Sequence, residues 1–310
     1  MLEDAPSMRD GAPLRPSEAS PALARGFALL VVATTGLIVL GALVRAHEAG
    51  LACPDWPLCF GEVVPQFDLQ VAFEWGHRVV AGTISLIFLG LAIATLRHPA
   101  GTRARPYLAA AGALLALQIV LGALTVWQLL AAWTVTSHLV VGNGFNVCLL
   151  LLALALSGRG GSAPVPGAVR GLLGVSAALL AVQIVLGGLV SSTFAGMACP
   201  EWPTCNGGHW FPSWSGTVGL HLLHRMNGYA LLLALALAAF AARAIPRVGP
   251  LAAGAFLLGA LQVVVGVSNV LLGIPVEVTG AHSLLAALLI LTMAATLQAA
   301  LERKLGDARV

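Results

Sequence analysis

Charged residues are scarce in this 310-residue chain. Asp, Glu, Lys and Arg make up only 9% of it, whereas a soluble globular domain carries about 25%. So few charges cannot cover a large water-facing surface, which excludes an ordinary soluble protein. The net charge of +3 gives no indication of a nucleic-acid partner, because the basic residues follow membrane topology instead.

Hydrophobic residues make up 58% of the chain and gather in eight runs. Each run is close to the ~20 residues that a membrane-spanning helix requires, and a helix satisfies its own backbone polar groups. The sequence therefore predicts an all-α integral membrane protein. The predicted spans are 26–46, 74–96, 107–127, 133–156, 170–191, 218–241, 250–271 and 278–300.

The N-terminal residues 1–25 are polar and proline-rich, which predicts a disordered tail. The first span is too long for the core of a cleaved signal peptide, so we expect it to remain in the protein. Basic residues concentrate in both tails and in alternate connections. By the positive-inside rule both termini are cytoplasmic, and the long connections 47–73 and 192–217 face outward from a bacterial cell membrane.

Cysteine is also scarce, and four of the five cysteines bracket two similar heptads, CPDWPLC (53–59) and CPEWPTC (199–205). Both heptads fall in the outward connections, where disulfides persist. We therefore expect two disulfides, Cys53–Cys59 and Cys199–Cys205. Free thiols and a shared metal site are the alternatives.

The heptads belong to a longer internal repeat. LIVLGALV (37–44) matches QIVLGGLV (183–190), and GHRVVAG (76–82) matches LHRMNGY (223–229). The repeat predicts two tandem four-helix halves, 26–156 and 170–300, joined by a cytoplasmic linker, 157–169, and followed by a tail, 301–310. An even number of spans in each half gives both the same orientation, so a pseudo-two-fold axis along the membrane normal is expected.

Five of the eight histidines lie within or at the start of predicted spans, where ionisable side chains are costly and are candidates for function. All five are on even-numbered spans and near the predicted outer face: His77, His138, His221, His224 and His282. The repeat pairs His77 with His224 and His138 with His282. Each half therefore has one matched couple, His77 with His138 and His224 with His282.

The second and fourth helices of a four-helix bundle lie diagonally across its core. Two imidazoles reaching inward from that diagonal could hold a haem iron between them. Zinc or copper is the alternative, although a structural zinc site needs four ligands. Arg78 and Arg225 directly follow histidines and could bind haem propionates; contact with lipid headgroups is the other interpretation.

Glu74 precedes His77 by three residues, so the two share a helix face. The equivalent residue of the second half is His221, which predicts different roles for the halves. Glu74 is a candidate for proton transfer, with the alternative that it orients a ligand or caps the helix. His221 could contact a propionate or replace His224 as a ligand.

Together the outer CPDWPLC loop, EWGHR on the second span, HR on the sixth, and single histidines near the start of the fourth and eighth spans resemble the haem A synthase family over about 26–300. The resemblance implies oxidation of the C8 methyl of haem O to a formyl group. It implies substrate haem at His77 and His138, with Glu74 catalytic, and a haem b cofactor at His224 and His282.

Two other functions use the same histidines. A di-haem b electron-transfer cytochrome would need neither Glu74 nor the difference between halves, and a haem transporter would hold exchangeable haem at both sites. The expected partners are haem O, membrane lipid and, through the pathway, a haem O synthase; the electron donor or acceptor stays unidentified.

Overall fold

The structure is a computed structural model that describes residues 19–99, 101–158 and 164–301. Within these ranges, eight α helices are long and apolar enough to cross a membrane, so the protein is an all-α, multi-pass membrane protein, as predicted. The predicted disorder of residues 1–18, the middle of the linker and the tail beyond residue 301 lie outside the described residues. The helices are α1 (Pro21–Ala46), α2 (Leu69–Arg97), α3 (Gly101–Trp127), α4 (Ala132–Leu156), α5 (Gly167–Ser192), α6 (Gly216–Ala242), α7 (Val248–Leu271) and α8 (Val276–Leu301).

The helices begin earlier than the hydrophobic runs predict. α1 starts at Pro21, so the last residues of the predicted N-terminal tail are helical, and α5 starts within the predicted linker. α2 gains an extra turn because the Asp68 side chain caps it by accepting a hydrogen bond from the Val71 backbone N–H at 2.8 Å. Capping and helix propensity act beyond the apolar segment, so hydropathy alone places these starts too late.

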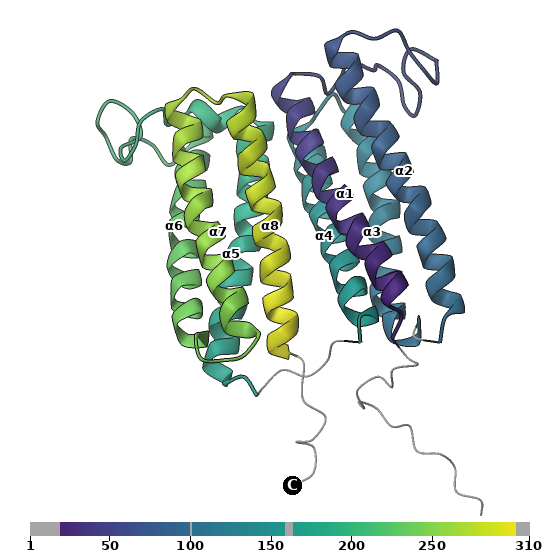
Figure 1. Cartoon of the computed structure of the whole chain (residues 1–310). Helices are drawn as coiled ribbons and strands as arrows, with labels where there is room; N and C mark the ends of the chain where they lie inside the picture. The colour runs from purple at the N-terminus through teal and green to yellow at the C-terminus, as the bar shows by residue number, and fades with distance from the viewer. Residues whose placement is uncertain (1–18, 100, 159–163, 302–310) are drawn as a thin grey trace, which may run out of the picture.

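The helices form two four-membered rings that stand side by side, with the long outer loops at one end and the described chain ends at the other (Figure 1). In the first ring, α1 and α3 each contact both α2 and α4. In the second, α5 and α7 each contact both α6 and α8. The even-numbered helices of each ring therefore lie on its diagonal, as expected for a four-helix bundle.

The seam between the rings consists of α1 and α4 against α5 and α8. Hydroxyl groups meet across it, with Thr136 Oγ1 3.2 Å from Ser192 Oγ. At the outer end, the Arg45 guanidinium donates to the Ser191 carbonyl at 3.1 Å and lies 4.0 Å from the centre of the Phe194 ring. Small and polar groups are the usual means of joining helices in lipid, where the hydrophobic effect does not drive association.

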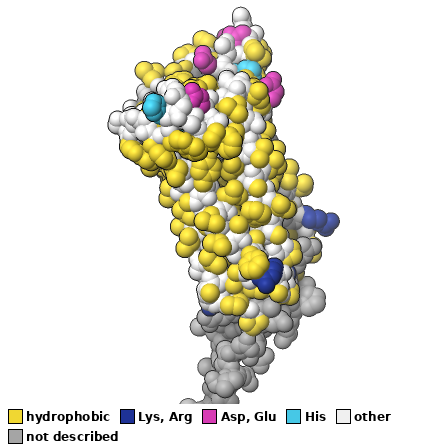
Figure 2. All heavy atoms as spheres, turned by 90° about the vertical axis from the view of Figure 1, so that its left-hand side faces the viewer, with side chains coloured by type: hydrophobic (Ala, Val, Ile, Leu, Met, Phe, Trp, Pro, Cys, Tyr) yellow, Lys and Arg dark blue, Asp and Glu magenta, His cyan; other side chains and the backbone are white. Residues whose placement is uncertain are grey.

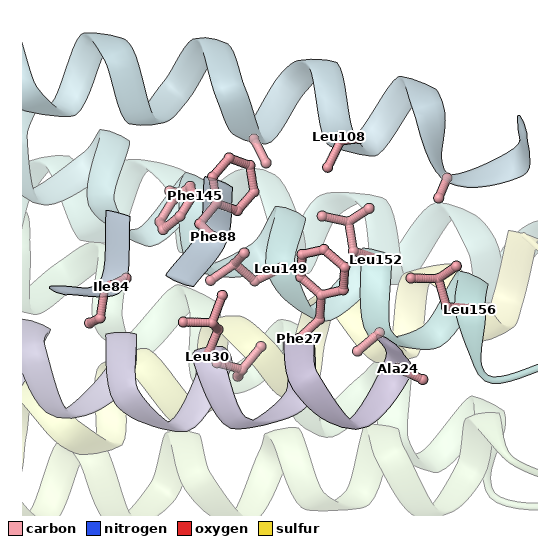
Figure 3. Packing of buried hydrophobic residues seen from close by; sticks show 14 of the residues in the cluster. Ala24, Phe27, Leu30, Ile84, Phe88, Leu108, Phe145, Leu149, Leu152 and Leu156 are labelled. Carbon is pink, nitrogen blue, oxygen red and sulfur yellow. The ribbon is translucent and has the colours of Figure 1, made fainter. Parts of the chain in front are cut away.

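Apolar side chains fill the end of the first ring opposite the loops (Figure 3). Phe27 from α1 meets Phe88 from α2 edge to face, with ring centres 6.5 Å apart. Leu149 and Leu152 from α4 are fully buried in the same cluster. The cluster leaves the loop end of the ring to the polar residues described below.

The outward side chains are also apolar, as a lipid-facing surface requires. Figure 2 shows hydrophobic side chains over the body of the molecule, with acidic side chains and histidines at the loop end and basic ones toward the other end. Leu29 and Leu257 are 71% and 65% exposed, respectively. The apolar body and the charged ends fit a protein that spans a membrane.

Replacing Phe27 by Ala should destabilise the first ring by roughly 1–3 kcal/mol. The packing and cavity contribution is lost, whereas the transfer contribution is small because the unfolded helix also lies in lipid. Thermal unfolding in detergent, followed by circular dichroism, measures the change. Leu29→Ala on the exposed face of the same helix is the matched control and should leave the transition within error; equal effects of the two changes would contradict the packing seen here.

Candidate functional site

The candidate site lies toward the loop end of each ring. His77 and His138 come from α2 and α4, the diagonal of the first helix ring. Their imidazole groups are close enough to influence each other electrostatically. His224 and His282 come from α6 and α8 and interact in the same way. The structure thus brings together the two couples that the repeat predicts.

Each of these histidines rests against a glycine of the preceding helix. A Cβ placed on Gly41 would lie 3.1 Å from Cε1 of His77, and one on Gly122 would lie 3.3 Å from Cε1 of His138. In the second ring, Gly187 and Gly266 face His224 and His282 at 3.2 and 3.0 Å. A side chain here would push each imidazole away, so the glycines fix how closely the histidines approach the neighbouring helix.

The ring nitrogens of these histidines have unused bonding capacity. The Nδ1 atoms of His77, His138 and His282 are buried and have no hydrogen-bond partner among the described residues. Unpaired buried nitrogens are costly, and an iron porphyrin that takes one nitrogen from each histidine would use such capacity. Two axial histidines per ring therefore fit haem.

The structure does not favour the zinc alternative. Within the described ranges, no three His, Cys, Asp or Glu side chains come together as a metal-binding group. A structural zinc site needs four such ligands, whereas a porphyrin brings four nitrogens of its own. The donor set thus matches haem better than a bare ion.

Glu74 is buried, 5% exposed, and connects α2 to the cysteine loop. Its Oε2 accepts the Cys53 backbone N–H at 2.8 Å, and its Oε1 accepts from the Arg78 guanidinium at 2.5 Å. Arg78 also donates to the carbonyls of Cys53, Asp55 and Leu58. Glu74 thus attaches the cysteine loop to α2, three residues before His77.

In the structure the partners of Arg78 and Arg225 are loop carbonyls, and their contact with haem propionates stays a prediction. Arg225 donates to the carbonyls of Cys199, Glu201 and Thr204, in parallel with Arg78. Both guanidinium groups are attached to their own outer loop. The sequence could not reveal this, because it does not say which acceptors lie within reach of a guanidinium group.

His221 takes a structural position. It is 4% exposed, and its Nδ1 lies 2.9 Å from the carbonyl oxygen of Ala195, in the short 3-10 helix η2 (Ala195–Met197). Where Glu74 accepts a loop N–H, His221 thus contacts a loop carbonyl. This contact favours neither of its predicted haem roles.

Both cysteine loops are closed by disulfides, Cys53–Cys59 and Cys199–Cys205. Each loop is also held by one carboxylate. Asp55 accepts the backbone N–H groups of Phe60 and Gly61 at 2.6 and 2.8 Å. Glu201 accepts those of Gly207 and Gly208, each at 3.0 Å.

These N–H donors lower the pKa of both carboxyl groups, with the Gly61 bond the main cause for Asp55 and the Gly208 bond for Glu201. A carboxyl group with a lowered pKa stabilises the folded loop above its ordinary value of about 4. That contribution is lost as the pH falls through the lowered value. The loops should therefore be firmly closed at neutral pH.

Comparison with known proteins now identifies the family. The model of the cytochrome oxidase assembly protein family COX15-CtaA matches residues 25–294. The chain belongs to this family. The haem A synthase of Shewanella oneidensis is 30% identical, with 86% of this chain and 92% of that protein covered. The haem A synthase of Halalkalibacterium halodurans is 32% identical, with 65% and 70% covered.

The chain is also similar to a protein that is not named haem A synthase. A protoheme IX farnesyltransferase of Halobacterium salinarum is 35% identical over 44% of this chain and 31% of its own length. The similarity thus involves a minor part of that protein.

Sequence reasoning missed the polar partners of the histidines. Gln118 Nε2 lies 3.1 Å from His138 Nε2, and Gln183 Nε2 lies 3.2 Å from His224 Nδ1. A signal was present in the sequence, because QIVLG recurs at 118–122 and at 183–187 with a glutamine four residues before the glycine. Its glycine does serve packing, since this is the glycine that faces the histidine.

Asp55→Ala should speed amide exchange at Phe60 and Gly61 at pH 7, because both donors lose their acceptor. In the parent, protection should be constant down to about pH 4 and should fall below it. Hydrogen–deuterium exchange of the loop peptide measures both effects. Glu62→Ala, an exposed acid in the same loop, is the control; loops that exchange alike in the parent and in Asp55→Ala would refute the closure by Asp55.

Proposed function

We propose that the protein is a haem A synthase, which oxidises the C8 methyl of haem O to a formyl group for use in terminal oxidases. The observation that carries this proposal is the two histidine couples, each half-buried and on the diagonal of a four-helix ring. The relatives named haem A synthase, one aligned over nearly its whole length, support it over the alternative of an electron-transfer cytochrome.

We assign the first ring to the substrate, with haem O held by His77 and His138. The support is the difference between the rings: Glu74 lies beside the first couple, whereas His221 stands at the equivalent place in the second. The second ring would hold a haem b cofactor through His224 and His282. Bound there, haem b would supply one-electron transfer.

The proposed oxidation proceeds in two stages. The methyl group becomes an alcohol and then a gem-diol. With water as the oxygen donor, each stage takes up one water molecule, replaces a C–H bond by a C–OH bond, and releases two protons and two electrons, the electrons passing to a one-electron acceptor outside the substrate ring. The gem-diol loses water to leave the formyl group. The protein must take up the released protons, and Glu74, three residues before His77, is the carboxylate that we assign to this task.

Glu74 therefore serves two purposes in this proposal. It fixes the cysteine loop through the Cys53 N–H, and it offers a proton acceptor at the substrate ring. The loop restricts water at this end of the ring. A closed loop at neutral pH, held also by Asp55, is consistent with chemistry in a site protected from solvent.

We further propose a bacterial cell-membrane location with both termini cytoplasmic, supported by the basic residues of the inner connections. A haem O synthase is the proposed partner, because it makes the substrate; the similarity to a protoheme IX farnesyltransferase supports this link.

An alkaline phosphatase fused after residue 310 should be inactive in the cell, whereas one inserted in the 192–217 loop should be active. The opposite result would reverse the orientation.

Glu74→Gln should reduce haem A formation by about 100-fold, because an amide accepts the Cys53 N–H but cannot take up a proton at neutral pH. The parent or the variant is expressed with a haem O synthase in a host that lacks haem A, and the pigments are separated by chromatography. Haem content and the Cys53–Cys59 disulfide, checked by mass spectrometry, should be unchanged.

Glu277→Gln, which changes the acid in the first turn of α8, is the control and should retain haem A formation. Parental haem A yield from Glu74→Gln would remove Glu74 from the chemistry. Haem b as the only pigment in every preparation, including the parent, would instead favour the cytochrome alternative.

A further inference from the structure

Each of the four helix pairs contains the same five-residue pattern. It reads LIVLG at 37–41, QIVLG at 118–122, QIVLG at 183–187 and QVVVG at 262–266. The glycine of each pattern faces the histidine of the next helix. The first residue lies four positions before the glycine and so on the same helix face, which places it beside that histidine.

In the second ring this first residue is a firmly held amide. Gln183 Nε2 lies 3.2 Å from Nδ1 and 3.4 Å from Nε2 of His224 and donates to the His224 carbonyl at 3.1 Å. Gln183 Oε1 accepts from Asn227 Nδ2 at 2.7 Å. Gly228 leaves the necessary space, since a Cβ there would lie 3.2 Å from Gln183 Nε2.

In the first ring, Gln118 contacts the fourth-helix histidine in a related way. Its Nε2 lies 3.1 Å from His138 Nε2, and Gly142 provides the space, with a Cβ there at 3.0 Å from Gln118 Nε2. The Gln118 Oε1 and His138 Nδ1 atoms are both buried without a partner in the described structure. An amide has a donor and an acceptor, so it can serve a ring nitrogen in either protonation state.

His77 differs from these two histidines. The residue at the position equivalent to Gln118 and Gln183 is Leu37, and the positions that correspond to Asn227 and Gly228 are Val80 and Ala81. Every polar group of the Gln183 arrangement is thus replaced by an apolar one. His77 Nδ1 is buried and has no partner among the described residues.

His282 lies between these cases, because it has a glutamine at the equivalent position but, within the described ranges, no hydrogen bond to it. Gln262 is present at the equivalent place, but no hydrogen bond joins it to His282 in the part of the chain that the structure describes. Ala286 stands where the other two glutamines have a glycine. His77 is therefore distinguished from the other three by having no amide at all beside it.

We propose that Gln118 and Gln183 are positioning residues that fix one haem ligand in each ring, and that His77, which lacks such a residue, is the ligand released when haem enters or leaves the first ring. This inference rests on the proposed function and adds the order of ligand exchange to it. Substrate haem would stay attached through His138 while the bond to His77 opens and closes.

The physical basis is the control of a metal ligand by its neighbours. A histidine that binds a metal through one nitrogen usually has the other held by a hydrogen bond, which fixes the ring orientation and raises its basicity. Loss of such a partner typically lowers metal affinity by about 10–100-fold. An enzyme must release its product but retain its cofactor, and the substrate ring is the one in which a ligand, His77, has no amide residue at the equivalent position.

The first test removes each amide separately. Purified protein is loaded with haem b at both sites, and haem loss to excess apomyoglobin is followed by absorbance. Gln118→Leu should accelerate one kinetic phase about tenfold or more, and Gln183→Leu should accelerate the other. In each variant the low-spin absorbance of the haem in the affected ring should also weaken. Altered helix packing alone would not cause this spectral change.

The second test supplies the missing amide, and it does not depend on destabilising the protein. Leu37→Gln combined with Ala81→Gly recreates the Gln183 arrangement beside His77. Haem loss from the first ring should slow about tenfold, and haem A release during co-expression should fall. Val39→Gln with Ala81→Gly puts the same amide on another face of α1 and should leave the rate unchanged.

Parental rates and spectra in both leucine variants, or in the Leu37→Gln/Ala81→Gly protein, would overturn the inference. His138→Ala and His224→Ala distinguish this failure from that of the proposed function. If those two variants lose haem but the glutamine variants do not, only the positioning role is wrong. If His138→Ala and His224→Ala also bind haem normally, the haem sites themselves are wrong.

Discussion

The structure depends on a close contact between an imidazole and a glycine, made once in each pair of helices. An imidazole within the membrane must be shielded from lipid and held at a defined place, and a Cβ on the glycine would lie only 3.0–3.3 Å from the ring. The glycine lets the helix backbone itself support the histidine. All four histidines come from the even-numbered helices, which lie on the ring diagonals, so the supported histidines form two couples.

The outer loops solve a second problem, which is how to close the end of each ring. A buried side chain of the even helix contacts the loop, Glu74 in the first ring and His221 in the second. In both rings, the arginine four residues further on donates hydrogen bonds to carbonyl groups of the loop. The polar groups of each loop are thus satisfied within the protein, as they must be near the membrane. The chemical difference between the rings is confined to the Glu74 and His221 positions and to the residues beside the histidines.

Much of this arrangement could be predicted from the sequence. The eight spans and the histidine couples follow from hydropathy and the internal repeat, because both reflect one-dimensional patterns. The helix starts were placed too late, since Asp68 and Pro21 extend helices outside the apolar runs. The roles of Arg78 and Arg225 could not be derived, because a sequence does not say which acceptor a guanidinium will reach. Gln118 and Gln183 were visible in a motif, yet their contact with histidine depends on the register between neighbouring helices, which only the fold provides.

The seam between the rings has a reciprocal form: α1 meets α8, and α4 meets α5. In the repeat, α1 corresponds to α5 and α4 to α8. The contact of α1 with α8 is therefore equivalent to the contact of α5 with α4. This is the pattern of an isologous interface between identical subunits. Duplication has placed both subunits of such a dimer in one polypeptide, and that covalent union leaves each copy free to lose or gain residues independently. Leu37 and Gln183 could diverge only because they are no longer encoded by the same codon.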